Sequence, residues 1–312
     1  MKTKEKNFVS AVVYLYNAEN SVEQFLKTLI GILDDNFEHS EIICVNDSSA
    51  DDTLSTIKSV SREAVSTNIS VVNMSYFHGL EVAMNAGVDL AIGDFVFEFD
   101  TTILDFDQSE IMKVYWRSLQ GYDIVSAVPN RKERFSSKVF YRVFDKFSEH
   151  SYEMHTESFR ILSRRVINRI SSMNKTIPYR KAIYASQGLK TDVIIYKPSQ
   201  IGRIKHDKQQ KGYRVGLAMD SLILFTQLGY QFSIMMTVLM MVISALMIIY
   251  SIMIFATANP VAGWTTTILF LSVAFFGLFG ILTIVIKYLQ LLVNLVFKKK
   301  HYSFEGIEKI TK

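Results

Sequence analysis

Apolar and polar positions along the first two hundred residues follow two alternating rhythms. Short runs of β-branched and aromatic residues predict strands at 8–16, 41–45, 69–74, 95–99, 123–128 and 193–196. Between them, apolar residues at helical spacing predict helices from Ser21 to about 33, from 51 onward, and at 80–91, 111–119, 139–147 and 161–170. Ser21 and Gln24 add a capping-box signature to the first helix. The alternation predicts an α/β domain with a mostly parallel sheet and helices on both faces.

The C-terminal third has a different pattern, because charged residues disappear from it. Residues 232–260 and 261–286 contain no Lys, Arg, Asp, Glu or His. A membrane-spanning helix needs roughly 20 apolar residues, so this stretch suits two helices, which Asn259-Pro260 divides. We therefore predict a two-helix transmembrane hairpin at about 232–257 and 263–287, with the second helix ending no later than 297. The alternative is two buried helices of a soluble protein, but such helices carry a polar face that these segments lack.

Domain boundaries follow from these two patterns. We expect an α/β domain over residues 1–200, a basic connector and juxtamembrane amphipathic segment over 201–231, the hairpin over 232–297, and a tail over 298–312. Lys287 and Lys298–Lys300 flank one side of the hairpin, whereas its turn carries no basic residue. Positive-inside reasoning places the α/β domain and both termini in the cytosol, in a multi-pass protein of the inner (cytoplasmic) membrane. The single cysteine, Cys44, excludes an internal disulfide, which agrees with this compartment.

The overall charge narrows the range of partners. A formal net charge of +4 is too small to indicate nucleic-acid binding, and part of it is the local Lys298–Lys300 cluster beside the membrane. Small residues in the uncharged stretches suit close helix packing and leave a homo-oligomer open; they are Ser244, Ala245, Gly277 and Gly280. We therefore expect the membrane, and no nucleic acid, among the partners.

Polar segments follow three of the predicted strands at the point where each strand ends. They cover residues 16–19, 46–53 and 100–102. Each one alone is typical of turns and helix N-caps, where Asn, Asp and Ser make local hydrogen bonds. In an open parallel sheet, however, ligands bind beyond the carboxyl ends of the strands. Together, the three segments predict one crevice at that edge.

Five sequence patterns, in this order and spacing, resemble the motifs of a known enzyme family. They are Tyr16-Asn17-Ala18-Glu19 (P-x-Y-N-E), residues 45–53 (V-D-D-G-S-T-D-G-T), Gly79, Ala83, Gly87 and Gly93-Asp94 (G-x3-A-x3-G-x5-G-D), residues 121–125 (G-Y-D-V-V), and residues 159–164 (F-R-L-x-S-R). With the twin C-terminal spans and basic tail, the chain resembles the family 2 glycosyltransferases over nearly its whole length. Within that family it is most similar to the polyprenyl-phosphate branch, which includes dolichol-phosphate mannose synthase and undecaprenyl-phosphate sugar transferases.

The resemblance implies a GT-A fold that binds a nucleotide sugar and a set of site residues. It implies nucleotide binding by Tyr16, Asn17, Glu19, Asn46 and Asp47. It implies Mg²⁺ or Mn²⁺ on the diphosphate, held by Asp100 and Thr102, because a hard cation stabilises the charge of that leaving group. Basic residues would bind phosphate, with Arg131 and Arg134 on the lipid phosphate. Asp100, Arg131 and Arg160 are the implied catalytic residues.

The chain departs from the family pattern at residues that would bind the nucleotide and the metal ion. Thr102 stands where the family's Asp-x-Asp has its second aspartate, and Asn46 replaces the first aspartate of V-D-D. A hydroxyl is a poorer ligand for Mg²⁺ than a carboxylate, so we expect a weakened metal site. Asp105 or Asp107 would supply the missing ligand if the loop were shifted.

Three functions remain open at this stage. The first is an enzyme that moves one sugar from a nucleotide sugar to a polyprenyl (undecaprenyl) phosphate at the cytosolic face, for a cell-surface glycan or lipid. The second is a weakened or inactive relative, acting as a nucleotide-sugar-binding or scaffold subunit of a membrane glycan-assembly complex. A processive polysaccharide synthase is disfavoured, because those relatives carry more spans and a Q-x-x-R-W motif that this sequence lacks.

Overall fold

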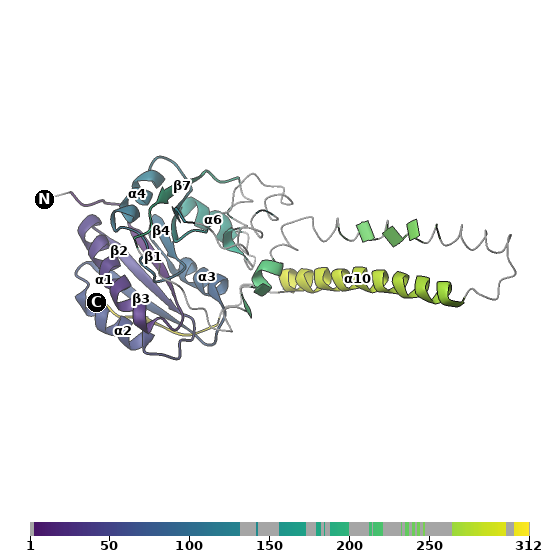
Figure 1. Cartoon of the computed structure of the whole chain (residues 1–312). Helices are drawn as coiled ribbons and strands as arrows, with labels where there is room; N and C mark the ends of the chain where they lie inside the picture. The colour runs from purple at the N-terminus through teal and green to yellow at the C-terminus, as the bar shows by residue number, and fades with distance from the viewer. Residues whose placement is uncertain are drawn as a thin grey trace.

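A computed structural model of the chain describes residues 3–131, 142, 156–172, 179–181, 184, 188–199, 212–213, 215–220, 264–297 and 303–311, with scattered residues between 232 and 246 (Figure 1). The predicted helix at 139–147, apart from Arg142, lies outside these residues. So do most of the predicted connector and most of the first uncharged stretch.

Strands and helices alternate through the first two hundred residues. The elements are β1 (Val9–Leu15), α1 (Glu19–Asn36), β2 (Ser40–Asn46), α2 (Thr53–Val60), a 3-10 turn (Ser61–Glu63), β3 (Thr67–Met74), α3 (Leu80–Leu90), β4 (Phe95–Phe99), α4 (Ser109–Ser118), β5 (Ile124–Pro129), β6 (Phe159–Ser163), α6 (Arg164–Ser172) and β7 (Thr191–Tyr196). Further along the chain are α10 (Trp264–Phe297) and β8 (Phe304–Lys309). The predicted strands are all confirmed, with ends that differ by one or two residues.

The strands form one eight-stranded sheet in the order β7-β5-β6-β4-β1-β2-β3-β8. Strands β3, β2, β1 and β4 are parallel neighbours, and β7 is parallel to β5. Only β6, between β4 and β5, and β8, beside β3, run antiparallel to their neighbours. The prediction of a mostly parallel sheet is therefore confirmed.

Helices cover both faces of this sheet, as the alternation along β1 requires. Val13 and Leu15 point into a core that contains the buried faces of α1, α2 and α4. Val12 and Tyr14, from the intervening positions, point into a second core formed with α3 and α6. Because successive strand residues face opposite sides of a sheet, an apolar strand such as β1 fits only between two helix layers.

The start of α1 differs from the prediction. The helix begins at Glu19 with Ala18 as its N-cap and without a side-chain cap. The Ser21 hydroxyl instead donates to the carbonyl of Ala18 at 3.3 Å, so the predicted capping box is wrong. A tertiary contact explains the difference. The Ala18 N–H donates to the Thr53 hydroxyl at 2.8 Å, so a residue of the neighbouring loop fixes where the helix begins.

The predicted helix at 161–170 is also wrong over its first three residues. Phe159–Ser163 forms β6, which pairs antiparallel with β4 on one side and β5 on the other, and α6 begins only at Arg164. Ile161 is buried in one core and Leu162 in the other. An apolar run with both faces buried has no period that separates strand from helix, so the partner strands decided the conformation.

The C-terminal tail forms an edge strand that the sequence did not reveal. β8 pairs antiparallel with β3, with Val72 opposite Ile307. The pairing is extended at both ends, where Ser75 N–H donates to the carbonyl of Ser303 at 3.1 Å and Ile69 N–H donates to the Thr311 hydroxyl at 2.7 Å. The residues after α10 are therefore joined to the sheet of the α/β domain.

Helix α10 covers nearly all of the second predicted hairpin segment and continues to Phe297. Within the part of the chain that the structure describes, none of the helices meets the length and apolarity required for crossing a membrane.

Removing residues 304–312 should expose the edge of β3 without unfolding the sheet. We expect amide hydrogen exchange at Ser70–Met74 to accelerate by about tenfold or more, because edge hydrogen bonds open locally before the core does. Glu305→Gln, which keeps the backbone pairing, is the control. Unchanged exchange in the truncated protein would show that β8 contributes nothing to this edge.

Candidate active site

The three polar segments lie at the same edge of the sheet. They follow β1, β2 and β4, which are parallel and adjacent in the order β2-β1-β4. Their carboxyl ends therefore point the same way, which is where open α/β sheets bind ligands. The topology brings together every predicted site residue of these segments, from Tyr16 to Thr102.

The loops after β1 and β2 are interlocked by hydrogen bonds. Asn17 has a positive φ of 49°, and its side-chain carbonyl accepts from Ala50 N–H at 2.9 Å. Glu19 accepts from Asp52 N–H at 3.2 Å, and its own N–H donates to Asp51 at 3.1 Å. Asn17 and Glu19, both predicted nucleotide ligands, thus also hold the shape of this edge.

Tyr16, Asn46 and Asp47 lie beside these loops. The ring of Tyr16 packs 4.8 Å from that of Phe77, centroid to centroid. Asn46 donates to the Asn73 side chain at 3.0 Å and accepts from Ser49 N–H at 3.2 Å. Its amide therefore links the end of β2 to β3 and to its own loop.

The Asp47 carboxylate is fully buried, and its hydrogen bonds connect the end of β2 to the start of α3. It accepts from His78 N–H at 2.8 Å, from Gly79 N–H at 2.9 Å and from the Tyr14 hydroxyl at 3.0 Å. Burial raises the pKa of Asp47 above its usual value, although these hydrogen bonds oppose the shift. The Asp47 carboxylate thus accepts from two N–H groups at a helix N-terminus, where the N–H groups have no partner within the helix.

Asp47→Asn should destabilise the domain by about 1–2 kcal/mol. The amide has one acceptor oxygen, so either His78 N–H or Gly79 N–H would face an NH₂ group. Tyr14→Phe removes only one of the three donors and should cost less. Chemical denaturation of both variants checks this order, and the reverse order would contradict it.

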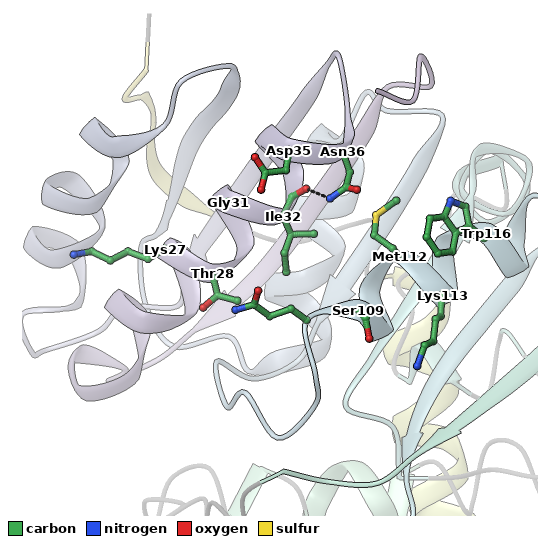
Figure 2. A pocket seen from close by; sticks show the side chains of 11 residues that line it. Lys27, Thr28, Gly31, Ile32, Asp35, Asn36, Ser109, Met112, Lys113 and Trp116 are labelled. Atoms are coloured by element: carbon green, nitrogen blue, oxygen red, sulfur yellow. Dashed lines mark hydrogen bonds between the residues drawn. The ribbon is translucent and has the colours of Figure 1, made fainter. Parts of the chain in front are cut away.

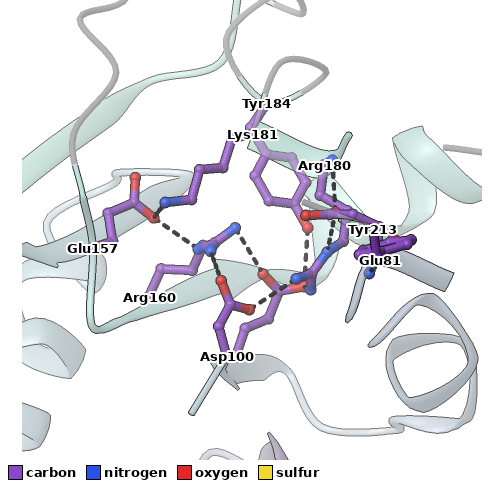
Figure 3. Close-up of polar contacts among 9 residues, drawn as sticks. Glu81, Asp100, Glu157, Arg160, Arg180, Lys181, Tyr184 and Tyr213 are labelled. Carbon is purple, nitrogen blue, oxygen red and sulfur yellow. Dashed lines mark hydrogen bonds and ion pairs between the residues drawn. The ribbon is translucent and has the colours of Figure 1, made fainter. Parts of the chain in front are cut away.

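Asp100, directly after β4, is held by two arginines. Its Oδ2 accepts from Arg160 at 2.7 Å and its Oδ1 accepts from Arg180 at 2.8 Å (Figure 3). Burial by itself raises the pKa of Asp100, but the charges of Arg160 and Arg180 outweigh it and hold the pKa well below the usual range. Asp100 is therefore an anion with both oxygens paired.

The two arginines belong to a larger buried group, which we name the arginine cluster. Its members are Glu81, Glu98, Asp100, Glu157, Arg160 and Arg180 (Figure 3). Arg180 donates to Glu81 at 2.9 Å and to Glu98 at 2.8 Å. Arg160 lies 3.3 Å from Glu98 and 2.9 Å from Glu157. Each guanidinium thus contacts three carboxylates.

The arginine cluster joins distant parts of the chain. Glu81 lies in α3, Glu98 in the buried centre of β4, and Arg160 in β6. Both arginines are only 1% exposed. Burial lowers the pKa of a guanidinium, but the surrounding carboxylates outweigh it, so the pKa of Arg160 and of Arg180 is raised. The charges are therefore fixed in a water-poor environment.

Sequence reasoning found Asp100 and Arg160 but missed Arg180, Glu81 and Glu98. The position of Glu98 could have indicated a buried ion pair, because a glutamate within an apolar strand needs a buried partner. Arg180 carried none, since it lies in a segment without a clear period. Among the other predicted phosphate ligands, Arg131 has a side chain 40% exposed and pairs with Asp105 at 3.3 Å. Arg134 lies outside the described residues.

The other predicted metal donors are also engaged. The Thr102 hydroxyl hydrogen-bonds that of Ser21 at 2.6 Å. Asp105 accepts from the Tyr196 hydroxyl at 2.8 Å, and Asp107 accepts from Ser109 N–H at 2.9 Å at the start of α4. Over the described residues, no three His, Cys, Asp or Glu side chains are grouped to hold a metal ion. As arranged, Asp100 is paired with two arginines, and Thr102, Asp105 and Asp107 are each hydrogen-bonded to a protein group.

A groove of about 410 Å³ lies elsewhere, between α1 and α4 (Figure 2). Its lining includes Lys27, Ile32, Lys113 and Trp116, and none of the predicted site residues borders it. The candidate site is thus the loop edge of the sheet and not this groove.

A mostly parallel sheet with helices on both faces and interlocked polar loops at its carboxyl edge is the arrangement of α/β proteins that bind ligands at that edge. The family model described as "Glycosyl transferase family 2" matches residues 10–171, and the chain belongs to this family. It thus has the GT-A fold of this family.

Several curated proteins are similar to the chain. An uncharacterized glycosyltransferase of Synechocystis sp. is 30% identical over 196 residues, covering 60% of each protein. The chain thus spans less than two thirds of that relative. A prophage bactoprenol glucosyl transferase homolog of Escherichia coli is 29% identical, covering 70% of this chain and 72% of that protein. The bactoprenol glucosyl transferase of Shigella phage SfV is 28% identical, covering 86% of this chain and 88% of the relative.

Among solved structures, glucosyl-3-phosphoglycerate synthase of Mycobacterium tuberculosis in complex with phosphoglyceric acid has a TM-score of 0.51 at 13% identity. The match covers 70% of this chain and 78% of that one. The same enzyme in complex with Mn²⁺, uridine diphosphate and phosphoglyceric acid has a TM-score of 0.50 at 13% identity, covering 70% and 76%. At this identity the likeness shows the shared fold alone.

Proposed function

We propose that the chain transfers one sugar from a nucleotide sugar to a polyprenyl phosphate. The observation that carries this proposal is the similarity to a bactoprenol glucosyl transferase, which extends over 86% of the chain and beyond the family domain. Bactoprenol is a polyprenyl lipid, so an acceptor phosphate at a membrane surface fits both the family and the uncharged C-terminal stretches.

The proposed chemistry needs little acid–base help from the protein. The acceptor phosphate is already anionic, so the enzyme has to position it against the sugar and stabilise the departing diphosphate. Tyr16, Asn17, Glu19, Asn46 and Asp47 are the candidates for holding the nucleotide. All five lie at the loop edge of β1 and β2.

Positive charge is the second requirement of the proposed chemistry. Arg131 and Arg134 are the candidates for binding the lipid phosphate, because a guanidinium binds phosphate through paired hydrogen bonds. The side chain of Arg131 reaches solvent at the end of β5. Arg160 is buried and contributes indirectly, because its ion pair holds the carboxylate of Asp100 in place.

The membrane arrangement is part of the proposal. Two spans at about 232–257 and 263–287 would anchor the chain in the inner membrane, with the α/β domain and both termini in the cytosol. This places the loop edge where a lipid phosphate and a soluble nucleotide sugar can meet. Protease protection of tagged termini in sealed vesicles tests the topology, and light scattering in detergent tests for a homo-oligomer.

The test of activity uses the purified full-length chain, undecaprenyl phosphate and a panel of radiolabelled nucleotide sugars. We expect one sugar to pass to the lipid, and expect Arg131→Ala to slow transfer by about 10²-fold through loss of a positioning charge. Thr28→Ala, in the groove between α1 and α4, is the control variant. If no labelled lipid forms across the panel while a competent transferase succeeds beside it, the proposal is wrong.

A second function, a nucleotide-sugar-binding subunit without turnover, is favoured by one observation. Both oxygens of Asp100 are paired with arginines, and Thr102 replaces the family's second aspartate. Nucleotide binding in the absence of any transfer would support this function over the enzyme.

A further inference from the structure

We infer that Arg160 and Arg180 occupy the place of the cation at Asp100, so that nucleotide binding by this chain needs no divalent metal. The inference rests on the proposed function, because it concerns how the same site handles the nucleotide diphosphate. Figure 3 shows the two guanidinium groups directed at the carboxylate from β6 and from the segment at 180.

Both oxygens of Asp100 are already in ion pairs, so a cation at this carboxylate would have to compete with two guanidinium groups. A divalent ion would need a carboxylate oxygen at about 2.0–2.6 Å. Each oxygen of Asp100 instead accepts from a guanidinium, at 2.7 Å from Arg160 and 2.8 Å from Arg180. An ion placed there would also lie beside two like charges, which repel it strongly where water is scarce.

The arginines are themselves locked in place. Arg180 is held from the far side by Glu81 and Glu98, and its backbone N–H also donates to Glu81 at 3.0 Å. Arg160 lies within ion-pair distance of Glu98, at 3.3 Å, and of Glu157, at 2.9 Å. Freeing Asp100 for a metal would require one guanidinium to leave a buried set of carboxylates, and such charges are costly to separate from their partners.

Other ligands at this edge are engaged as well. The hydroxyl of Thr102 is paired with Ser21, and Asp105 is paired with Tyr196 and Arg131. Asp107 is used at the start of α4. Among the described residues, Thr102, Asp105 and Asp107 are each hydrogen-bonded to a protein group, so a cation would have to replace one of these contacts. Basic side chains would then balance the charge of a bound diphosphate in place of a metal ion.

The first experiment measures nucleotide affinity by calorimetry on the full-length chain in detergent. UDP, GDP, ADP and CDP are titrated in excess EDTA and again in MnCl₂. We expect the nucleotide that binds to have the same Kd in both buffers within about twofold. Binding that is at least about tenfold tighter with Mn²⁺ would overturn the inference. Direct Mn²⁺ titration followed by electron paramagnetic resonance should detect no bound ion, and a bound ion lost in Asp100→Asn would equally overturn it.

A second experiment uses a variant in which nucleotide binding should become sensitive to Mn²⁺. Arg180→Lys keeps one charge but cannot reach Glu81, Glu98 and Asp100 together, so Oδ1 of Asp100 becomes available. We expect Mn²⁺ to tighten nucleotide binding in this variant and not in the natural chain. Arg165→Lys is the matched control, because Arg165 also pairs with a carboxylate, that of Asp123, but its own side chain is exposed. A natural chain that responds to Mn²⁺ as strongly as Arg180→Lys would contradict the inference.

Sugar transfer in EDTA separates this inference from the proposed function. Transfer that persists in EDTA supports both. Transfer that occurs only with Mn²⁺ retains the proposed function and overturns the metal-free site. If no transfer occurs in either buffer, the proposed function fails, and the calorimetry and resonance measurements still decide whether Asp100 binds a metal.

Discussion

Replacing Arg180 by Met is expected to destabilise the α/β domain by about 3–5 kcal/mol, because buried carboxylates lose a shared cation. Glu81, Glu98 and Asp100 all contact this guanidinium at 2.8–2.9 Å. A domain of about 200 residues loses roughly 2–4 °C of Tm for each kcal/mol, so Tm should fall by about 6–20 °C. Thermal unfolding followed by circular dichroism measures the change.

Arg165→Met is the matched control for this prediction. Arg165 also pairs with a carboxylate, that of Asp123, but its side chain is 71% exposed. Exposed ion pairs contribute about 0–1 kcal/mol because water screens them. Equal losses in the two variants would show that burial of the arginine cluster does not set its contribution.

Gly87→Ala should destabilise the domain by an amount near the upper end of about 1–3 kcal/mol. A Cβ at Gly87 would collide with the side chains of Val12 and Val45, which are fully buried on β1 and β2. Neither valine can move away, because each is β-branched and fixed on a central strand. Helix α3 would therefore have to lift from the sheet.

The matched control lies in α1. Gly31 is also inside a helix, but a Cβ there meets no atom within 4 Å. Gly31→Ala should stabilise the protein by about 0.5–1 kcal/mol, because alanine loses less backbone entropy in a helix. Urea denaturation of the two alanine variants should give shifts of opposite sign. A stabilised Gly87→Ala would show that α3 does not approach the sheet this closely.

Packing also explains the family-like spacing of Gly79, Ala83 and Gly87. Ala83 and Gly87 lie one helical turn apart on the face of α3 that is buried against the sheet. Gly79 has a φ of +85°, a left-handed conformation that favours glycine. Its N–H is one of the donors to Asp47. The motif thus brings α3 close enough to hold the loop edge, and Glu81 in its first turn reaches Arg180.

The sequence by itself determined the order of strands and helices along the α/β domain and the edge where the polar loops gather. The alternation along β1 and the helical spacing in α1 are local patterns, and each reports which side of an element is buried. The parallel arrangement then fixed the position of Asn17, Asp47 and Asp100 at one edge, because parallel strands end on the same side. The spacing of these same segments gave the resemblance to the family 2 glycosyltransferases, and the family model that matches residues 10–171 shows the membership.

Only the tertiary structure decided how Asp100 is used, and which segments complete the sheet. Arg180 meets Glu98 across 82 residues of chain, and β8 meets β3 across more than two hundred. Such pairings produce no periodic pattern in the sequence, because they depend on where distant segments lie once the core has formed. Local pattern therefore predicted that Asp100 lies at the loop edge, where the structure places it. Folding brings Arg160 and Arg180 to Asp100, and only this contact makes Asp100 the counter-ion of two arginines.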